Sequence, residues 1–479
     1  MKKLPLEINK VLIIAPHPDD EINIGGQLII ECVKKKISVY VLYTTNGDNN
    51  TKIGNKRLKE AIDSLEVLGV PEEHVIFLGY SNDWTNGKHI YDKGCGEILQ
   101  SKSGCVETSA IDEHMEYIFK KEGIHHSYTR DNFKLDFKNA IGDLLPELII
   151  AVDMDTHPDH RAASLMLEEV IGELLKEKSD FRPLILKKFA YSGVWKGPKD
   201  YYTRPMAPTV NTIGSVYNDL VFETGSPFFK WDDRLSFMVP EETVTPLLSQ
   251  NVIYQAAKMH KTQVAWYQML RAINGDVVYW WRPTNNVFTN AKINVSSGEI
   301  SYLTDFKYFE ISKMVQGLDE ISKSTYAWTP CKEDMEKTIS IELKERTDIE
   351  TLVIIGDYNP SNCITEIAVS CDGQRKVYRN EHKDIKWQIQ LNAHRVNTVL
   401  IEILGHEGIP AIAELEAYEH SLKFESMYVF PLRFYENNKR QHNKKKTILQ
   451  WLEYLYLNLL FLIRFKIKYE VKNLMGVNK

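Results

Sequence analysis

The sequence predicts an α/β domain with a parallel sheet, an antiparallel β-sandwich after it, and a basic C-terminal tail that contains an amphipathic helix. Short apolar runs that alternate with helix-like segments indicate the first part. Period-two alternation of apolar residues from about residue 291 indicates the second part, and a basic stretch from residue 439 marks the third. We therefore expect three regions, with boundaries at 1–285, 290–420 and 421–479.

The fold is expected to begin with a buried strand followed by a helix. Five apolar residues, Val11–Ala15, are typical of a short buried strand, and Pro16 ends it because proline donates no ladder hydrogen bond. Residues Gln27–Lys36 read as a helix. The turn between them carries four ionisable side chains: His17, Asp19, Asp20 and Glu21. Because α/β sheets place their ligands at the carboxyl ends of the strands, this turn is a candidate functional site.

The next segments repeat the alternation of strand and helix. Ile37–Tyr43 is β-branched and aromatic, residues 56–68 place leucines and isoleucine at helical spacing, and His74–Leu78 reads as a third strand. This order predicts a doubly wound sheet with right-handed crossovers. Residues 80–139 lack the pattern, and a long irregular insertion in such a domain is usually a lid or a substrate loop.

A second ionisable cluster follows another predicted strand, Glu147–Val152, and precedes a helix from about residue 161 to residue 178. The cluster consists of Asp155, His157, Asp159 and His160. Within each cluster, residues three apart share one face of a helical turn. Two histidines and one carboxylate would form a metal site with an open position for water, and the remaining acid and histidine would carry protons. A single such motif would instead fit a capped helix with a surface histidine.

Both clusters resemble the signatures of a known family. Residues 15–21 (APHPDDE) and 155–162 (DTHPDHRA) are similar to the two motifs of the PIG-L/LmbE-like N-acetylglucosaminyl deacetylases, zinc hydrolases with a Rossmann-like fold. Thr45–Asp48 and the segment 257–263 (AKMHKTQ) also resemble family segments, with Lys-Thr in place of the usual Arg-Ser. The resemblance covers about residues 9–283.

The resemblance implies a role for each site residue. It assigns His17, Asp20 and His160 as ligands of Zn²⁺, with Fe²⁺ or Co²⁺ as other metals that such a site accepts. It assigns Asp19 as the general base, protonated His157 as the stabiliser of the oxyanion and Asp159 as the residue that orients His157. Asp155 stands where some relatives have a tyrosine. Three further residues are expected at the substrate, although each also suits a solvated helix or a loop turn: Arg57, Asp48 and Asp83.

The expected reaction is hydrolysis of the acetamide of an N-acetylhexosamine unit, which releases acetate and a free amino sugar in surface-glycan or glycolipid biosynthesis. An amidase for a non-sugar amide and a non-catalytic glycan-binding protein are the alternatives. The net charge of −6 argues against nucleic acid as a partner. The first turn lacks GxGxxG, which disfavours a dinucleotide binder. Only five apolar residues follow Lys2 and Lys3, so we expect no signal peptide and a cytoplasmic location.

The β-sandwich resembles galactose-binding-like domains of the discoidin type. The similarity rests on Ile367–Gly373 (IAVSCDG) and on the strand at 412–419 (IAELEAYE). If this domain binds glycans, Trp328 and Trp387 would stack on sugar rings. Trp387 also alternates with neighbouring isoleucines, which is typical of a core position.

The tail combines basic and apolar residues. From residue 439 onward, ten Lys or Arg against two Glu give a net charge of +8, which leaves −14 on the rest of the chain. The stretch Ile448–Ile463 has a single charge, Glu453, and is shorter than the ~20 residues that span a bilayer. Its aromatic residues and basic flanks suit a helix that lies on an anionic membrane through residues 439–468, at the inner face. Docking on the protein itself or on a partner is the alternative, and the oligomeric state stays open.

Overall fold

The computed structural model describes most of the chain. The described ranges are 6–48, 53–85, 89–92, 96–112, 115–155, 157–190, 201–202, 209, 233–265, 272–273, 275–308, 327–357, 361–424, 428–435 and 445–463.

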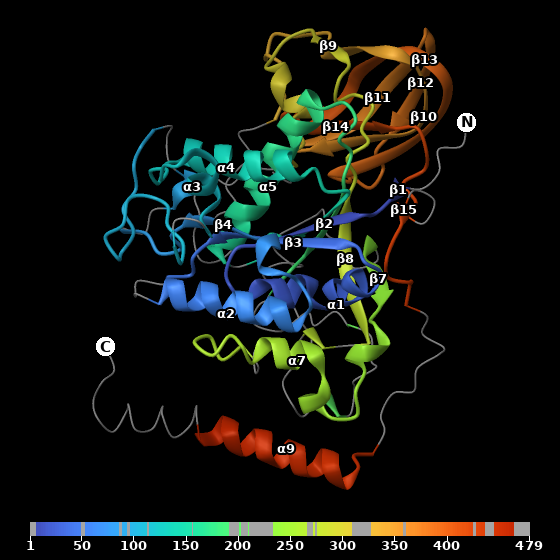
Figure 1. The fold of residues 1–479 in the computed structure, drawn as a ribbon. Helices are drawn as coiled ribbons and strands as arrows, with labels where there is room; N and C mark the ends of the chain where they lie inside the picture. Colours follow the sequence, from blue (N-terminus) through green and yellow to red (C-terminus); the bar gives the residue numbers. More distant parts are fainter. Residues whose placement is uncertain are drawn as a thin grey trace.

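A seven-stranded sheet forms the centre of the N-terminal part, in the order β4-β3-β2-β5-β6-β8-β7 (Figure 1). Its strands are β2 (Lys10–Ala15), β3 (Ser38–Thr45), β4 (Val75–Tyr80), β5 (Leu148–Val152), β6 (Leu184–Lys188), β7 (Leu235–Met238) and β8 (Asp276–Arg282). The first five strands in this order run parallel, whereas β8 pairs antiparallel with both β6 and β7. The four strands predicted from apolar runs are confirmed within two residues at each end. Because β2 and β5 are neighbours, the two ionisable clusters meet at one edge of the sheet.

Helices cover both faces of this sheet (Figure 1). On one face lie α1 (Asp20–Lys34), α2 (Gly54–Val67) and α7 (Val252–Ala257); on the other lie α3 (Tyr117–Glu122), α4 (Arg130–Leu144) and α5 (Pro158–Glu177). An apolar core lies on each face of the sheet, and alternate residues of β2 point into one or the other. Val11 and Ile13 pack with α1, whereas Leu12 and Ile14 pack with α4 and α5. Helix α1 begins at Asp20, seven residues before the predicted start, so the turn after β2 is short. The first cluster is therefore held rigidly between a strand and a helix.

An antiparallel sheet forms the next part, in the order β12-β11-β13-β10-β14, with β9 also paired to β10. Its strands are β9 (Lys292–Val295), β10 (Thr338–Gly356), β11 (Cys363–Cys371), β12 (Gln374–Arg379), β13 (Lys386–Glu407) and β14 (Ile412–Tyr418). The register of β10 against β13 shifts between Glu342 and Thr351. Apolar residues from before and after these shifts, such as Ile341 and Leu352, share one core, so the sheet folds over on itself. We call residues 292–418 the β domain.

Both tryptophans that the sequence offered for sugar stacking lie in that core. Trp328 is fully buried and Trp387 is almost so. The Nε1 of Trp328 donates to the carbonyl of Ser297. The expected stacking of these two side chains on a glycan is therefore wrong, because neither ring presents a face to solvent. The core reading of Trp387 is confirmed.

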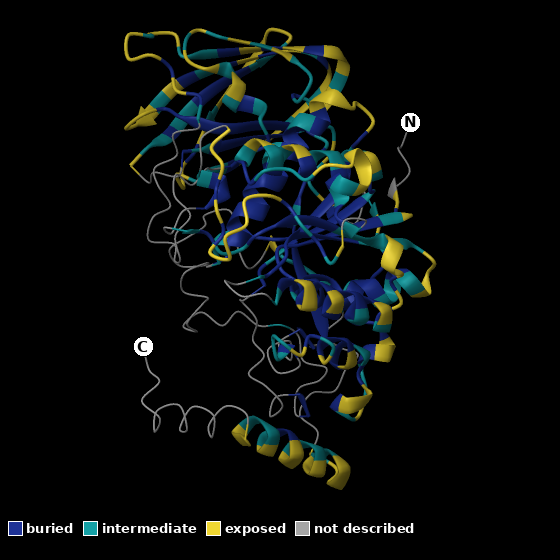
Figure 2. Ribbon diagram, turned by 60° about the vertical axis from the view of Figure 1, so that its left-hand side comes forward, coloured by how far each residue is buried: buried dark blue, intermediate teal, exposed yellow. Residues whose placement is uncertain are grey.

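The β domain packs on α5 of the N-terminal part. Val353, Ile355 and Tyr418 belong to the same apolar cluster as residues of α4 and α5. Arg282 of β8 donates to the phenol oxygen of Tyr308 at 2.8 Å and to the carboxylate of Glu416 in β14 at 2.5 Å. Figure 2 shows continuous burial across this contact.

A glycine of α5 makes the contact possible, and its replacement is a test of it. A Cβ on Gly172 would lie 2.2 Å from the carbonyl oxygen of Asp305 and 3.1 Å from Cβ of Phe306. We expect Gly172→Ala to destabilise the protein by about 1–3 kcal/mol through overpacking. Gly142→Ala on α4 is the matched control, because its Cβ would meet only Leu174 at an ordinary 3.6 Å. Thermal unfolding of both variants measures this difference in stability. Equal unfolding midpoints for the two variants would contradict a tight contact at Gly172.

The segment after β14 returns to the N-terminal part before the last helix. Strand β15 (Tyr428–Val429) pairs in parallel with β1 (Leu6–Glu7). Phe424 and Leu432 belong to the core that contains α1 and β2. Helix α9 (Ile448–Phe461) then lies at the surface, with a complete capping box at Thr447 (Figure 1). Among the described residues, no helix is both long and apolar enough to cross a bilayer.

Candidate metal centre and active site

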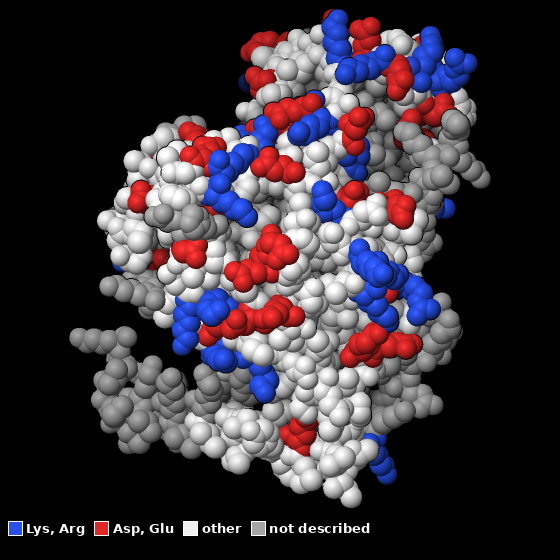
Figure 3. All heavy atoms as spheres, in the orientation of Figure 1, with Lys and Arg blue, Asp and Glu red and all other residues white. Residues whose placement is uncertain are grey.

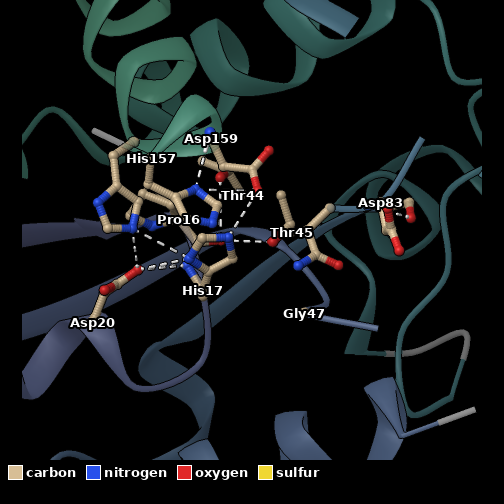
Figure 4. A network of polar contacts seen from close by, with 12 residues as sticks. Pro16, His17, Asp20, Thr44, Thr45, Gly47, Asp83, His157 and Asp159 are labelled. Carbon is tan, nitrogen blue, oxygen red and sulfur yellow. Dashed lines mark hydrogen bonds and ion pairs between the residues drawn. The ribbon is translucent and has the colours of Figure 1, made fainter. Parts of the chain in front are cut away.

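Two helix N-termini bring the candidate ligands together at the edge of the sheet (Figure 4). After β2, His17 lies in the short turn and Asp20 opens α1. After β5, His157 caps the N-terminus of α5, Pro158 takes the first helical position, and His160 follows within the first turn. Proline suits that position because its missing N–H would have no helical partner. The paired motifs thus fold as the sequence predicted, with one cluster from each of two adjacent strands.

Three atoms of this cluster form a triangle. His17 Nδ1 lies 3.0 Å from Asp20 Oδ2 and 3.3 Å from His160 Nε2, and the last two atoms are 3.2 Å apart. Ligand atoms that share a tetrahedral zinc ion at ~2.0–2.2 Å lie about 3.3 Å from one another. The spacing of these three donors therefore fits a metal ion. Among the described residues, His17, His157 and His160 also form a group whose ligand atoms lie within 4.8 Å of one another.

Each of the two histidines is oriented by a second carboxylate. His17 Nε2 lies 2.8 Å from Asp159 Oδ2, and His160 Nδ1 lies 2.7 Å from Asp155 Oδ2. These bonds fix the rings so that the opposite nitrogens face the triangle, as outer carboxylates do around metal-bound histidines. Asp155, which replaces the tyrosine of some relatives, thus serves to hold His160. Burial would lower the pKa of His160, but Asp155 and Asp20 raise it well above its usual value.

Asp159 also binds a histidine that the sequence analysis did not identify. His89 Nε2 lies 2.8 Å from Asp159 Oδ1, and the ring is buried. Burial would raise the pKa of Asp159, yet the bonds from His17 and His89 hold it well below its usual range. His89 lies in the irregular insertion, where no periodicity or motif marks it. Only the folded chain brings it to the site.

His157 is held differently from the expectation that Asp159 orients it. Its Nδ1 accepts a hydrogen bond from the backbone N–H of Asp159 at 3.2 Å, whereas the Asp159 carboxylate lies 3.7 Å away. Burial, together with the neighbouring His17 and His160, lowers the pKa of His157 to about 3. A neutral ring that accepts at Nδ1 carries its proton on Nε2. His157 is therefore a hydrogen-bond donor through Nε2 without being an imidazolium.

Asp19 lies beside the triangle in an unusual backbone conformation, with φ 139°. Such a conformation is costly for a residue other than glycine and is typical of functional sites. Its N–H donates to Glu21 Oε2, and Glu21 in turn binds the buried His260 at 2.7 Å. The late segment 257–263 thus holds the first turn of α1 in place. Burial raises the pKa of Asp19, opposed by the guanidinium of Arg57.

Arg57 joins the loops around Asp19. Its guanidinium donates to the carbonyls of Gly47 and Pro18 and lies 3.7 Å from Asp19 Oδ1. The side chain is buried, so the reading of Arg57 as a solvated helix residue is wrong. Gly47 has φ 61°, and a Cβ there would lie 2.5 Å from Arg57 Nη1. The glycine therefore makes room for the guanidinium.

The two remaining candidates bind the insertion rather than the histidine cluster. Asp48 accepts hydrogen bonds from the hydroxyls of Ser81 and Ser103, and Asp83 pairs with Lys102 at 2.5 Å. Figure 4 shows Asp83 separated from the histidines, beyond Gly47. Asp48 thus attaches the described part of the insertion to the sheet edge, whereas Asp83 and Lys102 pair within the insertion. Contact of either carboxylate with a substrate stays a proposal.

The geometry defines an α/β domain with a histidine–carboxylate cluster, spaced as metal ligands are, at the carboxyl edge of its sheet. Residues 12–171, about a third of the chain, match the family described as PIG-L: GlcNAc-PI de-N-acetylase. These residues form a PIG-L family domain, which confirms the resemblance drawn from the two motifs. A comparison with curated protein sequences gave no match.

Solved structures of low identity are similar to parts of the chain. An N,N'-diacetylchitobiose deacetylase from Pyrococcus horikoshii is 17% identical, with a TM-score of 0.25 over 39% of this chain. A conserved protein from Thermus thermophilus is 14% identical, with a TM-score of 0.32 over 58% of this chain and 96% of its own. A family 32 carbohydrate-binding module from C. perfringens NanJ is 14% identical, with a TM-score of 0.22 over 28% of this chain and 96% of its own. The chain spans 62% of the length of the P. horikoshii deacetylase.

Proposed function

We propose that the N-terminal part is a metal-dependent N-deacetylase that hydrolyses the acetamide of an N-acetylhexosamine unit. The observation that carries this proposal is the triangle of His17, Asp20 and His160 next to the partly buried Asp19. The PIG-L family match over the same residues supports the substrate class. Surface-glycan or glycolipid assembly is the setting that we propose for this reaction.

The metal would be held by His17 Nδ1, Asp20 Oδ2 and His160 Nε2. When bound, a divalent ion at these donors acidifies a water molecule and polarises the acyl oxygen. We propose Zn²⁺ because two imidazoles and one carboxylate suit it, while Fe²⁺ and Co²⁺ accept the same donors. Asp159 and Asp155 keep the ring nitrogens turned toward the ion.

The proton transfers fall to residues of this chain. Asp19 accepts a proton from the attacking water, since its raised pKa makes it a better base than a solvent-exposed aspartate. The new C–O bond forms as the acyl oxygen gains negative charge, and His157 donates to that oxygen from Nε2. Asp19 then passes the proton to the nitrogen as the C–N bond breaks, which leaves acetate and an amine.

Release of acetate tests this proposal. The full-length protein, stripped of metal by a chelator and reloaded with one equivalent of Zn²⁺, is incubated with N-acetylglucosamine, its β-linked dimer and a lipid-linked N-acetylglucosamine. Acetate from any of these sugars, lost with the chelator and restored by metal, supports the proposal. Acetate release from a simple aliphatic acetamide at equal efficiency would instead favour the amidase alternative. Metal-loaded protein that hydrolyses neither class contradicts the enzyme and leaves glycan binding.

We further propose that α9 places the enzyme on the inner face of the cytoplasmic membrane. The helix docks on the protein through one stripe only: Leu457 is 3% exposed, and Glu453 accepts hydrogen bonds from the N–H groups of Leu248 and Ser249. The opposite side is apolar and exposed, and Figure 3 shows it almost free of charge. Its exposed members are Ile448, Leu449, Trp451, Leu452, Leu455, Tyr456, Leu459, Leu462 and Ile463.

Two features favour a lipid surface as the partner of this apolar face. Lys446 Nζ lies over the rings of Trp451 and Tyr454, which places a cation beside aromatic residues of the kind found at membrane interfaces. The segment from residue 439 onward carries a net charge of +8 in the sequence, which suits anionic headgroups. The hydrogen bonds of Glu453 also fit the alternative, in which the helix docks on the protein itself. One side of α9 can therefore contact the protein while the opposite side contacts a membrane.

Vesicle flotation measures this contact. We expect the protein to float with vesicles that contain about a third phosphatidylglycerol and to stay at the bottom with phosphatidylcholine alone, because polybasic attraction needs anionic lipid. Leu452→Glu combined with Leu455→Glu should abolish flotation. Leu400→Glu with Leu404→Glu, two exposed leucines of β13, is the matched control and should float as before. Concentration-dependent dimers that the α9 variant abolishes, without flotation, would show a second copy as the partner instead.

A further inference from the structure

A cavity lies between the N-terminal sheet and the β domain, away from the triangle of donors. Its volume is about 270 Å³. The two residues after β5 and residues of α5, β6, β8 and β13 line it, together with Leu422 and Phe424. Tyr308, Lys386 and Gln388 of the β domain complete the lining, so the cavity lies where the two parts meet.

Buried charges form one wall of the cavity. Lys187 Nζ contacts the hydroxyl of Ser164 at 2.9 Å and the carboxylate of Glu168, and it lies 3.5 Å from Asp153 Oδ1. All four side chains are buried and line the cavity. Asp153 Oδ2 and Glu168 Oε2 have no hydrogen-bond partner within the described part of the chain. Two carboxylates thus share one ammonium group, and each keeps one oxygen that requires a donor.

Two further cations, Arg282 and Lys386, and one further carboxylate, Asp233, line the cavity. Arg282 is paired with Glu416 and Tyr308, and its guanidinium lies 3.8 Å from the ring centroids of Phe306 and Tyr308. Its positive charge is therefore neutralised within the contact between the two parts. Around Lys187 itself, the carboxylates of Asp153 and Glu168 outnumber the one ammonium group, which gives this wall a local negative charge.

Aromatic side chains form the remaining walls. Trp280, Trp281 and Phe424 line the cavity, and Trp281 packs edge-on against Phe424. Aromatic faces beside a few buried polar groups are the surroundings that sugar rings occupy in proteins. The volume is near the lower end of small-molecule sites, which suits one ring of monosaccharide size.

We propose that this cavity is a binding site for an amino sugar. An ammonium group offers three donors and a positive charge, which match the two unpartnered carboxylate oxygens and their excess charge. The ring hydroxyls find further partners at the cavity wall, and the tryptophans cover the apolar face of the ring. The inference rests on residues of the cavity and does not require the proposed deacetylation. Asp153, which lines the cavity, and Asp155, which holds His160, face separate sites although only one residue lies between them.

Calorimetric titration of the metal-loaded full-length protein tests the site, with glucosamine and glucose as probes. We expect saturable binding of glucosamine at pH 7 and at least tenfold weaker binding of glucose. Gln388→Trp narrows the cavity at an exposed lining position and should weaken glucosamine binding at least tenfold. Gln390→Trp is the matched control, because it stands two residues further along β13 and does not line the cavity.

A second variant tests the charge. Glu168→Gln keeps the size of the side chain but removes the excess negative charge, so the preference for glucosamine over glucose should fall to less than threefold. Equal affinities of the wild type for the two sugars, or glucosamine binding that Gln388→Trp leaves unchanged, would overturn the proposal. Because binding is read without turnover, an inactive catalytic centre would leave this result intact.

Discussion

Asp19→Asn should lower kcat for acetate release by about 10³-fold, within the 10²–10⁴-fold range of general acid–base catalysis. The carboxylate is partly buried next to the donor triangle, and its raised pKa prepares it to accept a proton. Asparagine keeps the shape and tolerates the unusual φ of 139° better than alanine does. The metal donors are unchanged, so the metal content should remain at one equivalent.

A matched control separates catalysis from stability. Asp63→Asn removes a carboxylate from the surface of α2, where Asp63 pairs only loosely with Lys59 at 3.7 Å. We expect its kcat and Tm to equal those of the wild type, since exposed pairs contribute little. A reduction of kcat by less than tenfold in Asp19→Asn, with metal still bound, would assign the base to another residue.

The second large effect concerns which residues hold the metal. Asp20→Asn should reduce metal content to a small fraction of one equivalent and abolish turnover, whereas His157→Asn should retain the metal and lose turnover. Asp20 Oδ2 lies close to both ring nitrogens of the triangle. His157 uses Nδ1 to cap α5, which leaves it the role of donor to the substrate. Metal analysis after gel filtration reads this difference directly.

The outer carboxylates provide a graded comparison. Asp155→Asn removes the acceptor of the bond that orients His160, and loss of such a partner costs about 10–100-fold in metal affinity. We expect its dissociation constant to lie between those of the wild type and Asp20→Asn. Retained metal in Asp20→Asn together with lost metal in His157→Asn would instead favour the three-histidine set.

Much of the metal centre could be predicted because its residues are adjacent to strands. Apolar runs such as Val11–Ala15 mark parallel strands, and parallel strands bring the residues that follow them to one edge. The two motifs therefore had to meet once β2 and β5 proved to be neighbours. The residues that surround the candidate ligands could not be predicted in the same way, because a hydrogen bond such as that between His89 and Asp159 joins residues 70 positions apart.

The remaining differences have a similar origin. The sequence allowed Arg57 to be a solvated residue of its helix, because helical spacing does not show which loops pack against a side chain. In the structure, the loops that contain Gly47 and Pro18 surround its guanidinium. Trp328 lies in the segment before β10 and is buried where it pairs with Ile412 and donates to Ser297, contacts that alternation along one strand does not reveal. The return of Phe424 and residues 428–435 to the N-terminal core was not predicted either, since a short aromatic segment suits a tail as well as a core.

Because the chain returns to the N-terminal part after β14, the β domain lies between two segments of the same part. Because β15 pairs with β1 and Phe424 packs in the N-terminal core, the N-terminal part is built from segments on both sides of the β domain. The β domain is thus an insertion within its host rather than a module appended to it. Truncation at residue 420 would remove Phe424 and Leu432 from the N-terminal core, whereas excision of residues 292–418 with rejoining of the cut ends is the cleaner way to separate the two parts.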